Sequence, residues 1–429
     1  MHTERSIPLL TRLRYSVFRQ LEKRATPTVG TALPAGKSAP ALWVFVSTIG
    51  ELNAIGPFLR QLVARHADLR LVLLTDRSIY RESYLAQYPQ AEVVEIGASG
   101  EPAHTLAQQR PPTLFVVAEI PCLPADAPCR LPIGYLYAAR AAGARVALVN
   151  GWLYGYAPAC RMDSIERSLL GRDYLALFDL LCVQTEAVAH HLQNSGAAAS
   201  QLHVTGNIKF DALAPAVRPP GETRSPRTLG SLDDGGRPVI VAGCLTDAEE
   251  LATVLDAFQR LVGDAPRSLL VLAPRHPENG AAMSAMFAEL QGRGLGFRNH
   301  AVEGDLPVPD DLPVLVLNTM GELRDYYARS TVSHVGKDHN ILEPLSFSRP
   351  VTITAGWNTT YPSYPVYTVA TREGLVYQAE SAEALAARWA SCINSETGSG
   401  TRVQASLARL AGATQRTLDL FSRQHGLSS

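Results

Sequence analysis

The feature that most constrains the fold is a repeated alternation between short apolar runs and segments of helical periodicity. The runs are rich in Val and Leu, as in LWVFV at residues 42–46 and LFVVA at 114–118. Continuous runs of this kind are typical of strands that are buried on both faces of a parallel sheet. In the first half of the chain they predict strands at 42–46, 71–74, 114–118, 145–149, 180–184 and 202–205.

The alternation stops once and then restarts. Residues 214–238 are dense in Pro, Gly, Arg and Asp, which is typical of a linker between domains. Further apolar runs then predict a second parallel α/β sheet, followed by a helical C-terminal segment. We therefore expect two doubly wound domains, at 42–215 and 236–429, and the last helices of the second could pack back on the first. The second set of predicted strands is 238–242, 268–273, 314–318, 331–335 and 350–353.

Length and composition agree with a folded two-domain protein. The chain has 429 residues, a formal net charge of -1 and a hydrophobic fraction of 46%. This charge balance disfavours nucleic acid as a partner. No apolar run is long enough to cross a bilayer. The six cysteines form no CxxC pair, which favours reduced thiols in a cytoplasmic protein.

Residues 1–24 form a separate feature, an amphipathic basic helix that a Pro/Gly-rich segment separates from the first strand. Leu10, Leu13, Val17 and Phe18 recur at helical spacing with Ile7 and Leu21, while Arg and Lys exceed Glu among these residues by 6 − 2 = 4. Two interpretations are open: the helix lies in an anionic membrane surface, or it packs on its own domain. The first would place a cytoplasmic protein peripherally at the inner membrane.

Ligands of doubly wound sheets bind beyond the carboxyl ends of the strands, so the residues that follow each strand are candidates for a site. Gly50 and Glu51 follow the first strand at a predicted helix start. Glu51 could cap the helix amides, or it could accept a proton from a substrate hydroxyl as a general base.

In the second domain, four strand ends carry groups suited to an anion. Gly243 lies in a small turn, Arg275 and His276 lie between two prolines, and Thr319 with Glu322 forms a predicted capping box. The loop from Gly336 continues through Lys337, His339 and Asn340 to Glu343, a carboxylate suited to a ribose diol. Together they predict a nucleotide site. Because no DxD tract stands where a metal bridge would need it, we expect metal-independent transfer, with the leaving phosphate stabilised by cationic side chains and helix starts.

Five motifs, in order from about residue 43 to 350, resemble the 3-deoxy-D-manno-oct-2-ulosonic acid (Kdo) transferases of lipid A biosynthesis. They are STIGELNA, VTGNIKFD, APRHPE, TMGELRDYY and HNILEP. The resemblance implies a GT-B fold, in which two Rossmann-like domains face each other across a cleft. It also implies inverting transfer from a CMP-linked sugar to a lipid or glycan acceptor, with no cofactor, and a membrane attachment through the N-terminus.

The resemblance places the general base on Glu51. It places the nucleotide site on Arg275, His276, Met320, Gly321, Glu322, Asn340 and Glu343. Gly243, Thr319, Lys337 and His339 complete the predicted donor site, and Gly50, Glu119, Asn150 and Lys209 form the predicted site for the acceptor or a donor carboxylate.

The sequence departs from the family pattern in three places. The family's acidic-aromatic segment ETELWPN retains one Glu, Glu119, and loses its Trp; the motif NARLSERS loses its first Arg after Asn150; and the Gly-rich loop before HNILEP is shortened. Alternatives therefore stay open: a UDP-sugar-dependent transferase with another acceptor, a UDP-sugar epimerase, or a non-catalytic glycan-binding relative.

Overall fold

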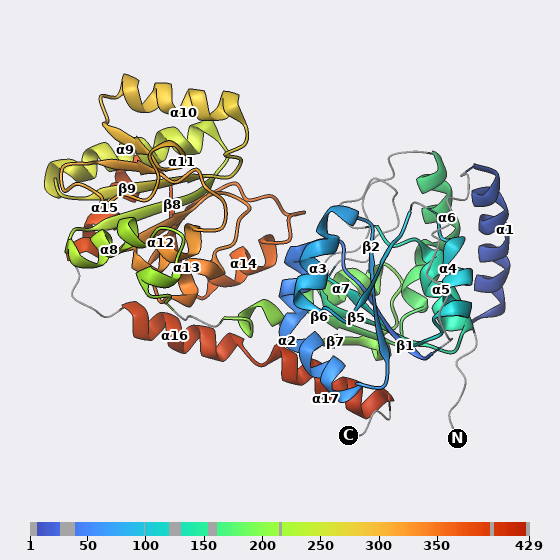
Figure 1. The fold of residues 1–429 in the computed structure, drawn as a ribbon. Helices are drawn as coiled ribbons and strands as arrows, with labels where there is room; N and C mark the ends of the chain where they lie inside the picture. The colour runs from blue at the N-terminus through green and yellow to red at the C-terminus, as the bar shows by residue number, and fades with distance from the viewer. Residues whose placement is uncertain are drawn as a thin grey trace. The chain divides into compact units, whose positions relative to one another are not determined.

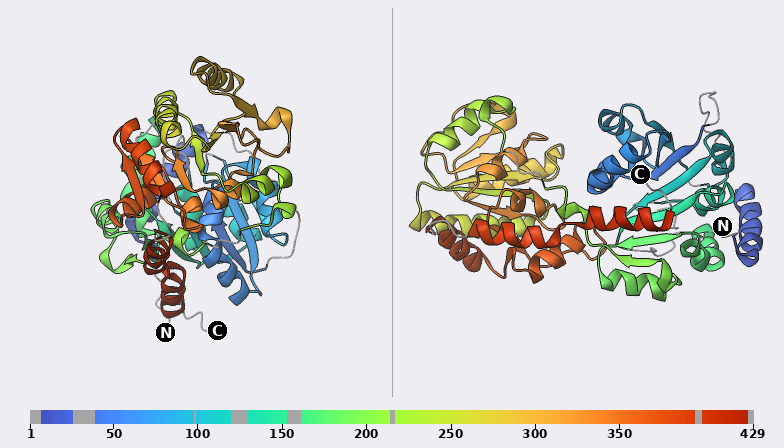
Figure 2. Two further views of the ribbon diagram at one scale, coloured as in Figure 1. Left: turned by 90° about the vertical axis from the view of Figure 1, so that its left-hand side faces the viewer. Right: turned by 90° about the horizontal axis from the view of Figure 1, so that it is seen from below.

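The computed structural model describes residues 7–25, 39–97, 99–119, 130–152, 161–213, 217–394 and 399–425. The chain divides into two compact units. Unit 1 comprises Met1–Ala212 with Leu410–Ser429, and unit 2 comprises Leu213–Arg409. Each unit is a seven-stranded parallel sheet with helices on both faces (Figure 1 and Figure 2). The expected α/β class with two doubly wound sheets is confirmed.

The sheet of unit 1 has the order β3-β2-β1-β4-β5-β6-β7, with β1 at its centre. Trp43 of β1 packs edge-on against Phe115 of β4, with ring centroids 5.6 Å apart, and apolar side chains fill both faces of the sheet. The strands are β1 (Ala41–Phe45), β2 (Arg70–Thr75), β3 (Glu92–Glu95), β4 (Pro112–Ala118), β5 (Arg145–Gly151), β6 (Leu180–Val183) and β7 (Leu202–Val204). The helices are α1 (Leu9–Ala25), α2 (Ile49–Arg65), α3 (Arg81–Gln87), α4 (Pro102–Gln109), α5 (Ile133–Ala141), α6 (Arg161–Ala176), α7 (Glu186–Asn194) and α17 (Ala413–His425).

The C-terminal helix α17 belongs to unit 1, although the rest of the C-terminal half forms unit 2. Phe421 of α17 contacts Phe58 of α2 edge-on at 5.0 Å between ring centroids. The carboxylate of Asp211 accepts hydrogen bonds from the backbone N–H groups of Gly412 and Thr414 at the start of α17. An anionic group at a helix N-terminus stabilises the helix. Asp211, which lies shortly after the last strand of the unit 1 sheet, therefore stabilises the start of α17.

The sheet of unit 2 has the order β10-β11-β9-β8-β12-β13-β14. Its strands are β8 (Val239–Leu245), β9 (Leu269–Pro274), β10 (Phe297–Asn299), β11 (Val314–Val316), β12 (Val332–Val335), β13 (Val351–Thr354) and β14 (Val376–Ala379). Its helices are α8 (Pro226–Asp234), α9 (Ala248–Asp264), α10 (Gly280–Gly292), α11 (His300–Glu303), α12 (Leu323–Arg329), α13 (Leu342–Ser346), α14 (Tyr364–Arg372), α15 (Ala382–Asn394) and α16 (Ser399–Leu410).

The segment 214–238 was expected to be a linker, but part of it is folded. Helix α8 buries Thr228, Leu229 and Leu232 in unit 2, and Asp233 on the same helix forms an ion pair with Arg329. The prediction of a linker was wrong here because the segment is rich in Pro and Gly. Helix α8 nevertheless begins with Pro226, a position where proline is well tolerated.

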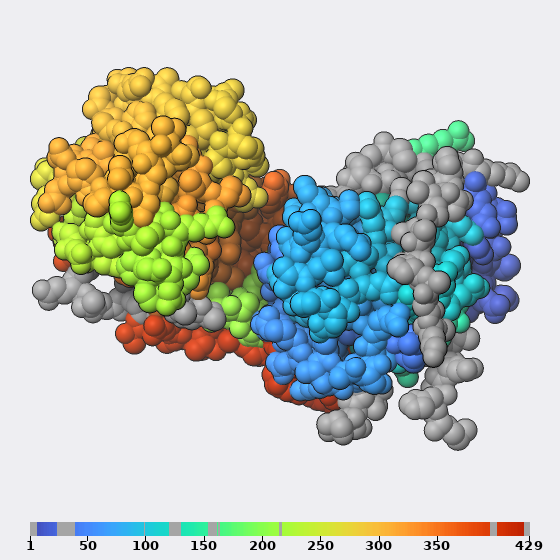
Figure 3. Space-filling model, in the orientation of Figure 1, coloured from blue at the N-terminus to red at the C-terminus, as the bar shows by residue number. Residues whose placement is uncertain are grey.

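Helix α1 packs on unit 1 through only part of its predicted apolar face. Tyr15 and Phe18 are buried, whereas Leu10, Leu13 and Val17 are more than half exposed. Thr11 and Arg14 bond to the buried carboxylate of Asp173 on α6, and these polar contacts fix the orientation of the helix. Figure 3 shows α1, in dark blue, at the surface of unit 1. Within the described residues, none of the helices combines the length and hydrophobicity that a membrane crossing requires.

Candidate functional site

Glu51 lies in the first turn of α2, directly beyond the carboxyl end of the central strand β1. Its side chain is buried, and one carboxylate oxygen accepts a hydrogen bond of 2.7 Å from the backbone N–H of Ser47. Thr48, the N-cap residue, in turn accepts from the N–H of Glu51 at 3.2 Å. Thr48 therefore caps the helix start, and the contact with Ser47 holds the Glu51 carboxylate at the sheet edge where ligands of such sheets bind.

Glu119, Asn150 and Lys209, three residues from separate parts of the sequence, meet at the same edge. Glu119 follows β4, and its carboxylate Oε1 accepts from Asn150 Nδ2 at 3.0 Å and lies 2.8 Å from Lys209 Nζ. Glu119 and Asn150 are almost fully buried, and the Lys209 side chain is 20% exposed. The buried carboxylate is thus both hydrogen-bonded and paired with a cation, as a buried charge needs to be.

The backbone at this edge is strained. Glu119 and Asn150 have positive φ angles, 56° and 59°, in the left-handed region that side chains other than glycine rarely adopt. Such conformations cost energy and persist where surrounding contacts enforce them, often at active sites. Here the Asn150 side chain accepts from the backbone N–H of Ile208 at 2.9 Å, which links the β5 end to the turn that carries Lys209.

Glu51 lies at the same edge as this polar cluster. Strands β1 and β4 are neighbours, and α2 packs against the short turn η3 (Ile208–Phe210) that carries Lys209. Two further residues complete the network: Gln184 donates to the Asn150 carbonyl at 2.9 Å, and Asn207 donates to Gln184 at 2.8 Å. Gly50, the remaining predicted residue of this unit, is exposed next to Glu51.

In unit 2, the ends of β8 and β12 approach each other too closely for side chains. A Cβ atom on Gly243 would lie 2.0 Å from the Tyr327 hydroxyl, and one on Gly336 would lie 2.4 Å from the Cys244 carbonyl. Cys244 itself has a φ of 62°. Among the residues that the structure describes, the Tyr327 hydroxyl finds no hydrogen-bond partner, and burial raises its pKa well above the usual value. Glycine at 336 is thus required for the ends of β8 and β12 to meet, and glycine at 243 is required by the side chain of Tyr327 on α12.

Arg275, which follows β9, contacts His339 in the loop after β12. Arg275 Nη1 lies 3.0 Å from His339 Nδ1, and burial together with the neighbouring Arg275 cation lowers the pKa of His339 to about 4. His339 is therefore neutral at physiological pH and accepts the Arg275 hydrogen bond, while Arg275 stays exposed for an anionic ligand. His276, by contrast, turns away and bonds to Glu278 at 2.9 Å at the surface.

Glu250, a residue outside the predicted site, stabilises the loop after β12 by hydrogen bonds. The buried Glu250 carboxylate accepts from the Lys337 backbone N–H at 3.2 Å and from the Thr354 hydroxyl, and it lies 3.6 Å from His334. Lys337 Nζ pairs with Asp247 at 3.2 Å. Lys337 therefore shapes the loop through contacts within the protein.

The predicted capping box at Thr319 is wrong. Helix α12 begins later, with Glu322 as its N-cap residue, and the structure assigns that cap no side-chain hydrogen bond. The buried Glu322 carboxylate instead accepts from the Ser225 hydroxyl, which also lies 2.9 Å from His300 Nε2. This cluster fixes the turn before α12, in which Gly321 has a φ of 84° and the Met320 side chain is 68% exposed.

The last two predicted donor residues flank the start of α13. Asn340 is exposed, and its side chain accepts from the Leu342 N–H at 3.2 Å. Burial raises the pKa of Glu343, and the nearby Arg324 cation opposes that rise. A largely buried carboxylate of this kind is suited to accept hydrogen bonds from ligand hydroxyls.

The depressed pKa of His339 predicts that unit 2 loses stability in mild acid. In the unfolded chain His339 titrates near the ordinary value of about 6.5. As pH falls from there towards 4, protons bind the unfolded state preferentially, so stability declines by on the order of 3 kcal/mol. Thermal melts of unit 2 as a function of pH should show this decline, and the His339→Gln variant should flatten it. If the variant kept the wild-type dependence of stability on pH, His339 would not be the residue that causes the decline.

Comparison with known proteins gives one family. Residues 129–212 match the family model described as 3-deoxy-D-manno-octulosonic-acid transferase (kdotransferase). The transferase of that name from Bordetella pertussis is 28% identical over 341 residues, which cover 76% of this chain and 73% of that protein. The one from Chlamydia trachomatis serovar D is 23% identical, covering 73% of this chain and 69% of the relative.

Solved structures agree in fold. A putative UDP-N-acetylglucosamine 2-epimerase from Listeria monocytogenes, 12% identical, matches with a TM-score of 0.58 over 91% of this chain and 98% of its own. A glycosyltransferase from Rickettsia africae, 11% identical, also matches with a TM-score of 0.58, over 90% and 99%. These likenesses establish the GT-B-like architecture alone. The chain therefore has a GT-B-like fold, and its sequence is similar to those of the Kdo transferases, which are glycosyltransferases.

Proposed function

We propose that this chain transfers Kdo or a related ulosonic acid from a CMP-linked donor to a lipid or glycan hydroxyl, with inversion and without a metal. The observation that carries the proposal is the likeness to Kdo transferases over about three quarters of the chain, including both units. The buried carboxylate of Glu51 and the exposed guanidinium of Arg275 supply the two groups that such a reaction needs.

Glu51 acts as the general base in the proposed reaction. It takes the proton of the acceptor hydroxyl while that oxygen forms a bond to the anomeric carbon. The bond from the anomeric carbon to the phosphate oxygen breaks on the opposite face, which inverts the configuration and releases CMP. Because Ser47 and Thr48 fix the helix start, the Glu51 carboxylate needs little reorganisation to reach an acceptor.

Arg275 stabilises the leaving phosphate in this proposal. Its contact with neutral His339 orients the guanidinium without cancelling its charge. The closely packed loops at Gly243 and Gly336 bring backbone to the ligand, and Glu343 accepts hydrogen bonds from the ribose hydroxyls. Lys209 is already paired with Glu119, so we assign it to shaping the acceptor side, where the polar cluster lies.

A membrane contact through α1 fits a lipid acceptor. The helix exposes Leu9, Leu10, Leu13 and Val17, each more than half accessible. A helix with an exposed apolar face and basic flanks is typical of a protein that lies on a membrane surface. We therefore assign the N-terminal helix a peripheral membrane role alongside the packing that Tyr15 and Phe18 provide.

A thermal-shift comparison of CMP, UDP, GDP and ADP tests the donor assignment. CMP is expected to raise the melting temperature by several degrees at concentrations well above its Kd, because a ligand at about 100 Kd adds about 2.7 kcal/mol. Arg275→Gln should remove most of this shift. Arg260→Gln, which alters an exposed arginine on α9 of the same unit, should keep it. A preference for UDP would contradict the ulosonic acid donor and favour a UDP-sugar enzyme.

A further inference from the structure

An arginine outside the predicted donor site lies against the turn before α12, which comprises residues 319–322. Arg224 Nη1 donates a hydrogen bond of 2.8 Å to the backbone carbonyl of Met320 in this turn. Arg224 lies between the short turn η4 (Pro220–Glu222) and α8, 96 positions before Met320. Only the fold therefore brings this side chain to the motif TMGELRDYY.

The next residue along the chain fixes Arg224 in this place. Ser225 donates a hydrogen bond to the buried carboxylate of Glu322, and its hydroxyl also lies 2.9 Å from His300 Nε2. Arg224 and the residue after it therefore both bond to the turn before α12, at two different points. A side chain that its neighbours already position loses less conformational freedom when it binds a ligand.

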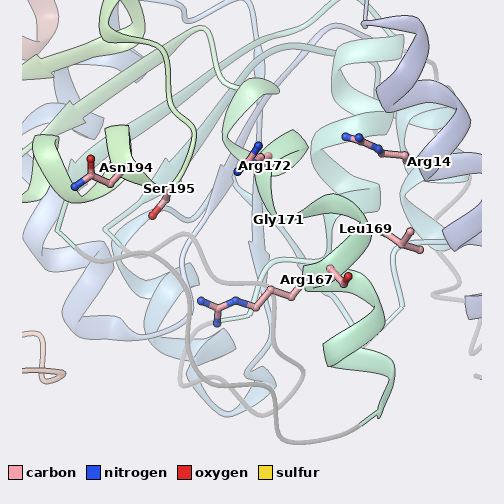
Figure 4. Close-up of a pocket in the computed structure, with 8 residues that line it drawn as sticks. Arg14, Arg167, Leu169, Gly171, Arg172, Asn194 and Ser195 are labelled. Atoms are coloured by element: carbon pink, nitrogen blue, oxygen red, sulfur yellow. The ribbon is translucent and has the colours of Figure 1, made fainter.

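The guanidinium of Arg224 keeps most of its hydrogen-bonding capacity for a ligand. Arg224 is exposed, and among the described residues its only hydrogen-bond partner is the neutral Met320 carbonyl. By contrast, Arg14 lines a pocket of unit 1 (Figure 4) and pairs with the Asp173 carboxylate at 3.1 Å. Arg224 therefore retains its charge and the N–H groups on Nε and Nη2 for recognition.

The turn before α12 adjoins the carboxylate that is assigned to the ribose. A Cβ atom on Gly243 would lie 3.0 Å from Leu323 Cδ2, so the start of α12 packs against the end of β8. Arg324, the next residue, lies 5.1 Å from the ring centre of Phe347 at the end of α13. Its charge also opposes the burial that raises the pKa of Glu343. A ribose bound at Glu343 would therefore bring its base to the turn before α12.

We propose that Arg224 selects cytosine over uracil in the donor nucleotide, by donating two parallel N–H bonds to N3 and O2 of the base. In cytosine these neighbouring atoms are both acceptors, and they match the fork of a guanidinium. In uracil N3 carries a hydrogen, so one N–H of the fork would face another donor. The Met320 side chain, 68% exposed, supplies apolar surface for the face of the ring. The proposal rests on the proposed function and names the residue behind its preference for a CMP-linked donor.

Calorimetric titration of the full-length protein with CMP and UMP tests this role of Arg224. The two ligands share the same ribose and phosphate, so the ratio of their Kd values reports on the base alone. We expect the wild-type protein to bind CMP about tenfold more tightly or better, as a bidentate arginine contact to a base typically provides. Arg224→Lys keeps the positive charge and loses the fork, so the two Kd values should become nearly equal.

Two controls separate base recognition from other roles. Arg227→Lys alters another exposed arginine of the same segment, on α8, and should keep the wild-type ratio. Ribose 5-phosphate carries no base, so Arg224→Lys should leave its Kd unchanged, whereas Arg275→Gln should weaken its binding. If Arg224 only held the turn before α12, its loss would weaken CMP and UMP by the same factor.

The role of Arg224 in base selection is overturned if Arg224→Lys keeps the preference for CMP, if it weakens CMP and UMP equally, or if it weakens ribose 5-phosphate as much as CMP. The CMP-linked donor is tested separately by the wild-type protein. If that protein binds UMP as tightly as CMP, or more tightly, both the selection by Arg224 and the CMP-linked donor are wrong. A preference for CMP that survives Arg224→Lys leaves the donor assignment standing and excludes Arg224 as its cause.

Discussion

The Glu51→Gln variant is expected to lose transfer activity by a factor of about 10² to 10⁴ while it keeps its fold and its CMP-induced thermal shift. The substitution removes the basic carboxylate and preserves the shape of the side chain. Its amide oxygen can still accept the hydrogen bond from the Ser47 N–H, so the turn before α2 keeps this contact. A radiolabelled or mass-spectrometric transfer assay, run beside a thermal melt, measures both properties on one sample.

A second pair of variants separates the stability of the helix start from catalysis. Thr48→Ala removes the hydroxyl that accepts from the Glu51 N–H, and we expect it to cost about 1 kcal/mol of stability with activity largely retained. Glu51→Ala removes the contact with the Ser47 N–H as well as the proposed base, so it should lower both stability and activity. If Glu51→Gln instead kept near-wild-type turnover, the Glu51 side chain would serve only the contact with Ser47 and the general-base assignment would be wrong.

The sequence was sufficient to predict the two sheets because their central strands are buried on both faces. Such strands, for example β1 and β9, appear as unbroken apolar runs. The unpredicted strands β3, β10 and β14 all lie at sheet edges. Edge strands lack a neighbour on one side and tolerate polar residues, as Glu92 and Glu95 of β3 show, so their sequences carry a weaker pattern.

The sequence placed the candidate residues at strand ends but could not give their contacts. Glu119, Asn150 and Lys209 were grouped by role, and the structure brings them within hydrogen-bonding distance. The pairing of Glu322 with Ser225 could not be predicted, because Ser225 lies 97 positions away in a segment that resembles a linker. Gln184 directly follows β6, and Glu250 lies in the first turn of α9. The sequence gives no sign that Gln184 bonds to the Asn150 carbonyl or that Glu250 accepts from the Lys337 N–H.

The Lys209→Met variant is expected to lower the free energy of unfolding of unit 1 by about 3 to 5 kcal/mol, because it leaves the Glu119 carboxylate buried without its cation. Glu119 is 1% exposed, so water cannot replace the lost partner. Asn150 still donates one hydrogen bond, but a neutral amide does not compensate a buried charge. Urea denaturation measures this loss of stability as a fall in the denaturant midpoint relative to the wild-type protein.

Two comparisons make that result specific to the buried pair. The double variant Glu119→Gln/Lys209→Met removes both charges and should recover much of the lost stability, since the neutral amide no longer needs a cation. Lys23→Met removes a lysine that pairs with Glu101 at the surface, where Arg19 still binds the same carboxylate, and should cost less than about 1 kcal/mol. Equal losses for Lys23→Met and Lys209→Met would mean that the strained edge near Glu119 and Asn150 does not depend on the ion pair. Recovery in the double variant without recovery of transfer would assign the pair to the acceptor side of the reaction as well as to the fold.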